Sequence, residues 1–212
     1  LDKVLEQNEQ FGIGMNGEIT AVTFGLFAAE DLTAADGSII PADGLLEILS
    51  VDENGHAVCK TDLPFGSYYL KELSTDGHYI LSDEKYPIIF DYAGQDIALV
   101  EIKANDGKPI DNDLIYGEIH GLKKDEDGNA LGGAVIGLFK ADCTEFTREN
   151  AIFTAISAED GGFSFADVPY GNWLVSEIEA PTGFVLSDET FAVTVDKDGA
   201  VIEVEIENTR IC

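Results

Sequence analysis

Apolar and polar residues alternate along much of the chain, and this alternation predicts β-strands. Ile202, Val204 and Ile206 alternate with glutamates, so one face of that segment would be buried and the other would face water. Residues 68–72 and 191–195 show the same period of two. Acidic turn sequences that contain glycine separate these runs, and no long segment has the spacing of an amphipathic helix. The pattern therefore predicts an all-β protein of short antiparallel strands arranged as sandwiches.

The two halves of the chain repeat one another. Residues 64–72 (PFGSYYLKE) correspond to residues 169–177 (PYGNWLVSE), and residues 81–84 (LSDE) recur at the same offset as residues 186–189 (LSDE). Upstream, residues 25–27 (GLF) correspond to residues 137–139 (GLF). The matched blocks keep the same order in both halves, which chance does not produce. We therefore expect two homologous β-sandwich domains, residues 1–113 with insertions and residues 114–212.

The charge of the chain excludes several classes of partner. The 212 residues include 41 acidic and 12 basic side chains, for a formal net charge of −29. A field of this sign repels phosphate backbones and anionic lipid, so we expect no nucleic-acid binding and no attraction to anionic lipid. The chain has no run of ~18 apolar residues, so we expect no membrane insertion by this segment. Apolar residues make up 45% of the chain, which is too many for a disordered acidic tail.

Cysteine chemistry is not expected to stabilise this chain. Cys59, Cys143 and Cys212 are too few for a disulfide scaffold, although one disulfide is an alternative, and their spacing does not suit a metal. The sequence therefore predicts no metal and no cofactor.

Three polar residues of the second half occupy positions that the alternation assigns to the interior. Glu177 shares a face with Trp173 and Val175, Asn208 continues the inward face of the last strand, and Lys123 has inward parity on the first. A buried carboxylate costs several kcal/mol unless it is paired or protonated. The alternative is that the glutamate lies at a strand end and reaches solvent.

Together, these three side chains suggest a covalent reaction. A desolvated lysine loses its proton readily and becomes a nucleophile. A protonated glutamic acid can polarise the side-chain carbonyl of asparagine and shuttle the proton. Attack on that amide would expel ammonia and leave an isopeptide bond. Such a bond would tie the first strand of the domain to the last.

At these residues the chain resembles a known family. Gly117, the strand that carries Lys123, the GLF segment, residues 177–184 (EIEAPTGF) and the terminal Asn208 resemble the B-type repeat of collagen adhesins, or SpaA-type pilin domain, of Gram-positive surface proteins. The resemblance covers residues 117–208. It implies a transthyretin-like sandwich of seven strands, a cell-surface location and an autocatalytic isopeptide bond. Lys123 would be the nucleophile, Asn208 the electrophile and Glu177 the catalytic acid.

The first half matches the pattern less closely. Glu72 aligns with Glu177, and Lys3 is the nucleophile candidate by elimination, provided that an insertion around residues 12–17 loops out. Two asparagines compete as the acceptor. Asn112 matches the exit sequence of the second half and is favoured, whereas Asn105 follows an apparent strand at residues 98–104. A further alternative is that the first half forms no bond.

The sequence therefore predicts a pair of stalk modules of a longer, extracellular, cell-wall-anchored adhesin or pilin. Their partners would be neighbouring repeats of the same protein, and the anchor would lie outside these residues. Cross-linking would be intramolecular and single-turnover, so no enzyme acting on external substrates is expected. The alternative is a host-binding module that grips an extracellular-matrix protein or glycan. Its binding loops would be the insertions at residues 28–44 and 142–151, because such loops sit on rigid sandwiches.

Overall fold

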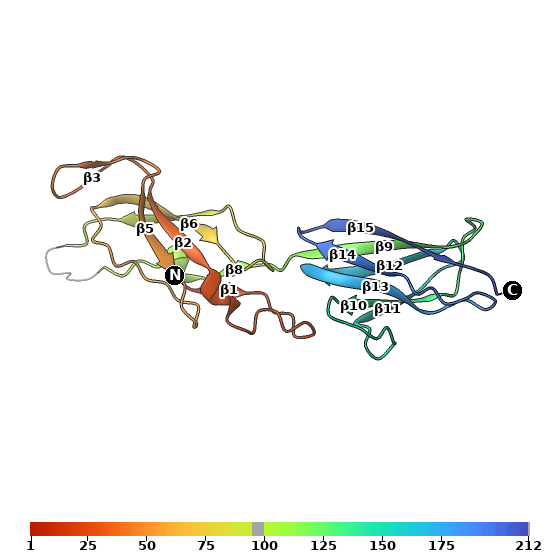
Figure 1. Cartoon of the computed structure of the whole chain (residues 1–212). Coiled ribbons are helices and arrows are strands. Elements are labelled where there is room, and N and C mark those ends of the chain that lie inside the picture. Colours follow the sequence, from red (N-terminus) through yellow and green to blue (C-terminus); the bar gives the residue numbers. More distant parts are fainter. Residues whose placement is uncertain (95–99, 212) are drawn as a thin grey trace. The chain divides into compact units, whose positions relative to one another are not determined.

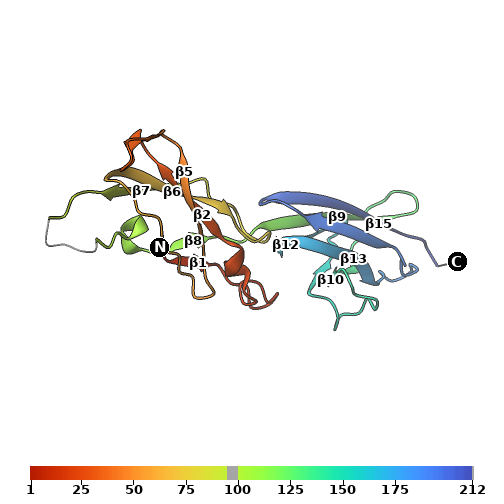
Figure 2. The same cartoon turned by 60° about the vertical axis from the view of Figure 1, so that its left-hand side comes forward.

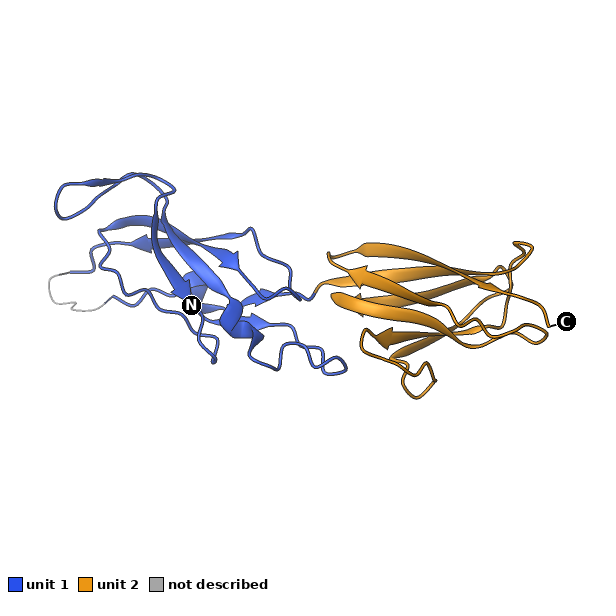
Figure 3. Cartoon of the chain, viewed as in Figure 1, with its two compact units in different colours: residues 1–114 blue, residues 115–212 orange. Residues whose placement is uncertain are grey.

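The computed structural model describes residues 1–94 and 100–211 and divides into two compact units (Figure 3). Unit 1 is Leu1–Leu114 and unit 2 is Ile115–Cys212, so the division falls one residue beyond the boundary that the repeat predicts. Strands build both units, and the helical elements in the described residues are short 3₁₀ turns (Figure 1). No helix in this part of the chain is long and apolar enough to cross a membrane.

Unit 2 is a seven-stranded sandwich, as the resemblance implies. Its strands are β9 (Tyr116–Asp125), β10 (Val135–Lys140), β11 (Phe153–Ile156), β12 (Gly162–Pro169), β13 (Gly171–Glu179), β14 (Thr190–Val195) and β15 (Ala200–Asn208). One sheet has the order β11-β10-β13-β14 and the other the order β12-β9-β15. Ile136, Leu138 and Val175 of the first sheet and Ile119 and Ile206 of the second are fully buried.

The first and last strands of unit 2 are neighbours and run parallel. β9 pairs with β15 in parallel, whereas the other ladders of the unit are antiparallel. In this register Ile206 lies opposite Lys123, and Asn208 lies opposite Asp125. Because side chains alternate along a strand, residues two apart share a face. Lys123, Ile206 and Asn208 therefore meet in the interior.

Unit 1 repeats this plan with a shorter second sheet. Its elements are β1 (Lys3–Leu5), η1 (Glu18–Ala21), β2 (Thr23–Ala28), β3 (Leu32–Thr33), β4 (Ile39–Ile40), β5 (Leu45–Ser50), β6 (Gly66–Ser74), β7 (Lys85–Phe90), η2 (Ala104–Gly107) and β8 (Ile110–Asn112). One sheet has the order β5-β2-β6-β7, β1 pairs with β8 in parallel, and β3 and β4 form a hairpin. The predicted insertion after β1 does loop out, and Asn8 and Ile13 pair across it.

A glycine accounts for the repeated GLF segments. The central leucines, Leu26 and Leu138, are buried in the two cores. A Cβ atom on Gly25 would lie 2.5 Å from the ring of Phe27, and one on Gly137 would lie 2.5 Å from the ring of Phe139. Each phenylalanine therefore folds back over the glycine two residues before it, on the face opposite the leucine. The repeat preserves this packing.

A test of the fold lies at Gly121 of β9, which pairs with Phe163 of β12. A Cβ atom there would overlap the ring of Phe163, which is 7% exposed. Gly121→Ala should lower the free energy of unfolding of unit 2 by about 1–3 kcal/mol, because the ring must leave its place in the core. Denaturant unfolding measures the loss. The control is Gly162→Ala on β12, where the nearest atom is the flexible carboxylate of Asp160 at 3.1 Å. Equal losses in both variants would contradict the packing.

Candidate cross-linking sites

Three predicted residues of unit 1 meet in its interior. Lys3 of β1, Glu72 of β6 and Asn112 of β8 are each at most 3% exposed. The Nζ atom of Lys3 donates a hydrogen bond to Oδ1 of Asn112 at 2.5 Å and lies 3.6 Å from Oε1 of Glu72. Nδ2 of Asn112 donates to the two carboxylate oxygens of Glu72 at 3.1 and 3.0 Å. One carboxyl group thus faces both the amine and the nitrogen of the amide.

The second set of predicted residues meets in unit 2. Lys123 of β9, Glu177 of β13 and Asn208 of β15 are at most 2% exposed, so Glu177 does not reach solvent at a strand end. The Nζ atom of Lys123 lies 3.8 Å from Oε1 of Glu177 and donates to the carbonyl oxygen of Ile206 at 3.1 Å. Nδ2 of Asn208 donates to Oε2 of Glu177 at 2.7 Å. Among the described residues, Oε1 of Glu177 and Oδ1 of Asn208 have no hydrogen-bond partner.

The two sets occupy the same register. Lys3 lies opposite Ile110, two residues before Asn112, and Lys123 lies opposite Ile206, two residues before Asn208. In both units the pairing is parallel, so the lysine and the asparagine are diagonal neighbours on the inward face. The strand register is defined by the backbone and not by the side-chain distances. It therefore supports, independently of those distances, that the sites in the two units are equivalent.

The competing asparagine lies elsewhere. Asn105 is in η2, with a left-handed backbone (φ 51°), and its amide donates to the carbonyl oxygens of Lys108 and Pro109 at 3.4 and 3.3 Å. Of the strand predicted at residues 98–104, residues 98 and 99 lie outside the described residues, and residues 100–103 form no strand. The structure therefore places Asn112, and not Asn105, beside Lys3.

Burial shifts both lysines toward the neutral amine. Desolvation lowers the pKa of Lys3 and of Lys123, and the nearby carboxylates of Glu72 and Glu177 oppose part of that effect. The lysine and glutamate side chains of both pairs are 0% exposed. An unprotonated lysine is a nucleophile, so the environment favours the form that can attack an amide.

A repeated serine fixes each glutamate, and the sequence analysis did not assign it a role. The backbone N–H of Ser82 donates to Oε2 of Glu72 at 2.9 Å, and that of Ser187 donates to Oε2 of Glu177 at 2.8 Å. Both serines belong to the repeated LSDE segments. This repetition is the sequence feature that could have indicated a shared role for the two serines. The second member of each segment orients the carboxyl group.

The asparagine amide has a different additional acceptor in each unit. Nδ2 of Asn112 also donates to the hydroxyl of Thr75 at 3.2 Å. Nδ2 of Asn208 also donates to the carbonyl oxygen of Val185 at 2.5 Å. Both contacts orient the amide nitrogen toward the glutamate. The alternation of apolar and polar residues does not predict these two acceptors, because Thr75 and Val185 lie beyond the ends of the strands that carry the glutamates.

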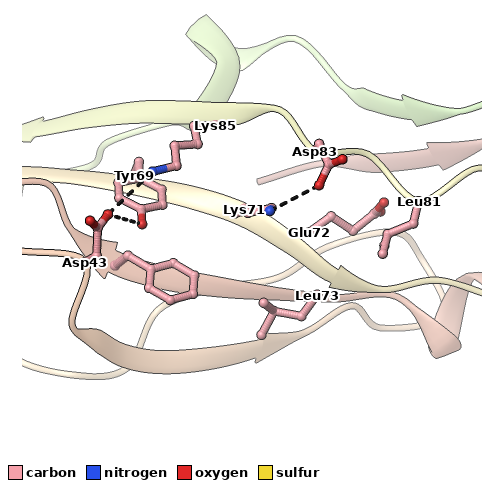
Figure 4. Close-up of a pocket in the computed structure, with 9 residues that line it drawn as sticks. Asp43, Tyr69, Lys71, Glu72, Leu73, Leu81, Asp83 and Lys85 are labelled. Carbon is pink, nitrogen blue, oxygen red and sulfur yellow. Dashed lines mark hydrogen bonds and ion pairs between the residues drawn. The ribbon is translucent and has the colours of Figure 1, made fainter.

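A surface cavity of about 520 Å³ opens on the outer face of the larger sheet of unit 1 (Figure 4). Asp43, from the insertion at residues 28–44, accepts a hydrogen bond from the hydroxyl of Tyr69 at 2.7 Å. The Nζ atom of Lys85 lies 4.0 Å from the centre of the Tyr69 ring, and Lys71 pairs with Asp83 at 3.1 Å. Four charged side chains of this cavity thus form two ion pairs, Lys71 with Asp83 and Lys85 with Asp43.

Comparisons with known proteins agree with this architecture. The family model described as "SpaA: Prealbumin-like fold domain" matches residues 117–210. Among solved structures, the Bacillus anthracis TIE protein is similar, with a TM-score of 0.67 and 19% identity over 99% of this chain; the chain spans 33% of that protein. A C-terminal fragment of the pilus adhesin SpaC from Lactobacillus rhamnosus GG has a TM-score of 0.55 and 13% identity, over 100% of this chain and 96% of the fragment. No curated protein sequence matches.

The family match covers the unit in which Lys123, Glu177 and Asn208 meet, and the structural likeness extends over both units. At these identities the likeness to solved structures concerns the fold. Residues 117–210 therefore match the SpaA prealbumin-like fold domain family, and the fold of the two units is similar to that of a pilus-adhesin fragment.

Proposed function

We propose that the chain is a pair of structural modules of a Gram-positive pilin or adhesin, each hardened by an autocatalytic isopeptide bond. The bonds would join Lys3 to Asn112 and Lys123 to Asn208. The observation that carries this proposal is the same buried lysine, glutamate and asparagine at the same strand register in both units. Simple ion pairing does not explain two such sets, because burying an ion pair offers little net stability.

The reaction follows from the contacts in unit 1. The lysine and the glutamate hold one proton between them, and transfer to Glu72 leaves a neutral amine beside a carboxylic acid. Nζ of Lys3, which lies beside Oδ1 of Asn112, attacks Cγ of the amide, and the acid lies beside the leaving nitrogen Nδ2. The proton lost from Nζ then reaches Nδ2 through Glu72, which lies 3.6 Å from Nζ and 3.0 Å from Nδ2. The Cγ–Nδ2 bond breaks, ammonia leaves, and the Nζ–Cγ bond remains.

Each bond would join the strand on which its unit begins to the strand on which it ends. Tension applied to the chain would then pass from β1 to β8, or from β9 to β15, without loading the residues between them. Such modules suit an extracellular, cell-wall-anchored stalk whose partners are neighbouring repeats. Each glutamate acts once and within its own chain, so the proposal assigns no enzymatic activity toward external substrates.

A second candidate function is binding of a host ligand. Phe65 is 57% exposed and Tyr92 is 62% exposed, and the ring of Phe65 lies 4.9 Å from Phe90 and 5.9 Å from Tyr92. An exposed aromatic cluster suits a matrix protein or a glycan. This cluster lies outside the insertions that the sequence analysis singled out, and it does not depend on the cross-links.

The intact mass of the purified protein under reducing, denaturing conditions tests both bonds. Each bond removes one ammonia, about 17 Da, so we expect a deficit of two ammonias from the calculated mass. Peptide mapping should then recover Lys3 joined to Asn112 and Lys123 joined to Asn208. A protein of full calculated mass would contradict the proposed function.

Glu177→Gln tests the role of the carboxyl group. Glutamine keeps the shape of the side chain but cannot serve as the acid, so the bond of unit 2 should not form while that of unit 1 does. The mass deficit should fall from two ammonias to one. The matched control is Glu179→Gln on the same strand, whose exposed carboxylate pairs with Arg148 at 2.6 Å, and it should keep both losses. Two losses in Glu177→Gln would show that the glutamate is dispensable.

The bond in unit 2 should also raise its stability. Chain-entropy estimates assign about 4–5 kcal/mol to a cross-link that closes a loop of this length. The free energy of unfolding of unit 2 in Glu177→Gln should therefore fall by about that amount. Trp173, the one tryptophan of the chain, lies in unit 2 and reports this transition by fluorescence. The Glu179→Gln control should unfold at the midpoint of the unsubstituted protein, and the same midpoint in Glu177→Gln would contradict a stabilising bond.

A further inference from the structure

Residues 209–210 follow β15 directly, and we call them the exit chain of unit 2. β9 and β15 lie side by side, and the exit chain is bound to the turn at the end of β9 (Figure 2). Nη2 of Arg210 lies 2.7 Å from Oδ2 of Asp125, and Nη1 lies 3.3 Å from Oδ2 of Asp127. The backbone N–H of Arg210 donates to Oε1 of Glu126 at 3.4 Å. One residue thus contacts three consecutive acidic residues of the turn.

The central partner, Asp125, is a buried carboxylate that the proposed reaction does not use. It is 2% exposed and lies opposite Asn208 in the strand register. Its Oδ1 accepts hydrogen bonds from the backbone N–H groups of Asp127 and Asn129 at 3.0 and 2.8 Å, and its Oδ2 accepts from Nδ2 of Asn129 at 3.0 Å. These hydrogen bonds, that of the Asn129 side chain first, lower the pKa of Asp125. Asp125 is therefore an anion at neutral pH, and Arg210 supplies the opposite charge.

A second set of contacts holds the exit chain from another side. Phe184 and Arg210 form an antiparallel bridge, and the backbone N–H of Val185 donates to the carbonyl oxygen of Thr209 at 2.8 Å. The carbonyl oxygen of Val185 in turn accepts from Nδ2 of Asn208. The exit chain is therefore bound both to the turn at the end of β9 and to the segment that contacts the reactive amide.

Unit 1 binds its exit chain, residues 113–114, in the same way but without the ion pair. Leu5 lies opposite Asn112, and Leu114 comes two residues beyond that asparagine, so these leucines are the equivalents of the paired charges. The backbone N–H of Leu114 donates to Oε2 of Glu6 at 2.7 Å, and Leu114 forms an antiparallel bridge on its other side. Leu114 is 2% exposed, and Leu5 packs against the hydrophobic core of the unit.

We propose that Arg210 is a positioning residue for the cross-link of unit 2. By binding the exit chain to the turn at the end of β9, it would keep Asn208 in register with Lys123 and beside Glu177. Before the bond forms, only non-covalent contacts retain the end of β15, and strand ends open locally more easily than strand centres. Each opening moves the amide away from the amine, so the rate of bond formation should follow the fraction of chains whose exit is bound. This inference rests on the proposed isopeptide bond.

The ion pair makes the two units differ in their response to salt. The side chain of Arg210 is 54% exposed, so dissolved ions screen its attraction to Asp125 and Asp127. The equivalent leucines of unit 1 carry no charge to be screened. The lysine and glutamate side chains of both reactive sets are 0% exposed, so a direct effect of salt on the reaction should be common to the two units. High salt should therefore slow the bond of unit 2 relative to that of unit 1.

The test follows both bonds in the same molecule. The full chain is made in a short pulse of cell-free synthesis, chased in buffer and denatured at intervals, and mass spectrometry of its peptides gives the fraction of each bond formed. Arg210→Gln should slow the Lys123–Asn208 bond about threefold to tenfold, the range expected for losing hydrogen bonds of this kind, and leave the Lys3–Asn112 bond unchanged. Arg210→Lys, which keeps the charge, should restore most of the rate.

The matched control is Lys124→Gln. Lys124 pairs with Glu205 at 2.8 Å, so this variant also removes an ion pair between β9 and β15, but one that does not involve the exit chain. It should leave both rates unchanged. A further arm uses the unsubstituted chain and needs no variant. A chase in about 1 M sodium chloride should slow the bond of unit 2 about as much as Arg210→Gln does in low salt, and leave unit 1 unaffected.

The fluorescence of Trp173 reports whether unit 2 is folded during the chase. Slower bonding of unit 2 among folded chains would support the positioning role, and slowing that only follows unfolding would overturn it. An unchanged rate in Arg210→Gln, equal slowing in Lys124→Gln, or an equal effect of salt on both units would also overturn it. These results leave both ammonia losses in the unsubstituted chain intact, whereas a chain that loses no ammonia contradicts the proposed function itself, so the two failures are distinguishable.

Discussion

The rest of each unit depends on a lysine held inside a β-sandwich. A charged lysine and a charged glutamate in an apolar interior cost several kcal/mol to desolvate, and their mutual attraction repays this only with good geometry. In both units the geometry comes from three strands that are far apart in sequence: the first, a central one and the last. The serine N–H of the LSDE segment then fixes the carboxyl group. A covalent bond would remove the charges and relieve the cost of burying them.

Parallel pairing of the first and last strands makes such a bond useful. Because β9 and β15 run side by side in the same direction, a lysine on one and an asparagine two residues beyond its partner on the other are diagonal neighbours. A link there joins the ends of the unit. The same arrangement in β1 and β8 indicates that both units were built on one plan, although the smaller sheet of unit 1 is much shorter.

The two units differ in the extent of the strand that carries the lysine. In unit 2 the strand that bears Lys123 continues upstream between two neighbours, and Ile119 seals the core. In unit 1 a cleft of about 810 Å³ lies beside Leu1, and its lining includes Leu26, Leu49 and Leu70.

The sequence by itself determined the all-β class, the two repeats and the buried candidates Lys123, Glu177 and Asn208, because a period of two assigns each residue to a face without knowledge of its neighbours. Glu72 followed from the repeat and Lys3 from elimination. Only the tertiary structure decided between Asn112 and Asn105, because that choice depends on the register between strands about a hundred residues apart, and local alternation does not encode register. The serine contacts and the parallel ladders were decided in the same way, by pairings between distant segments.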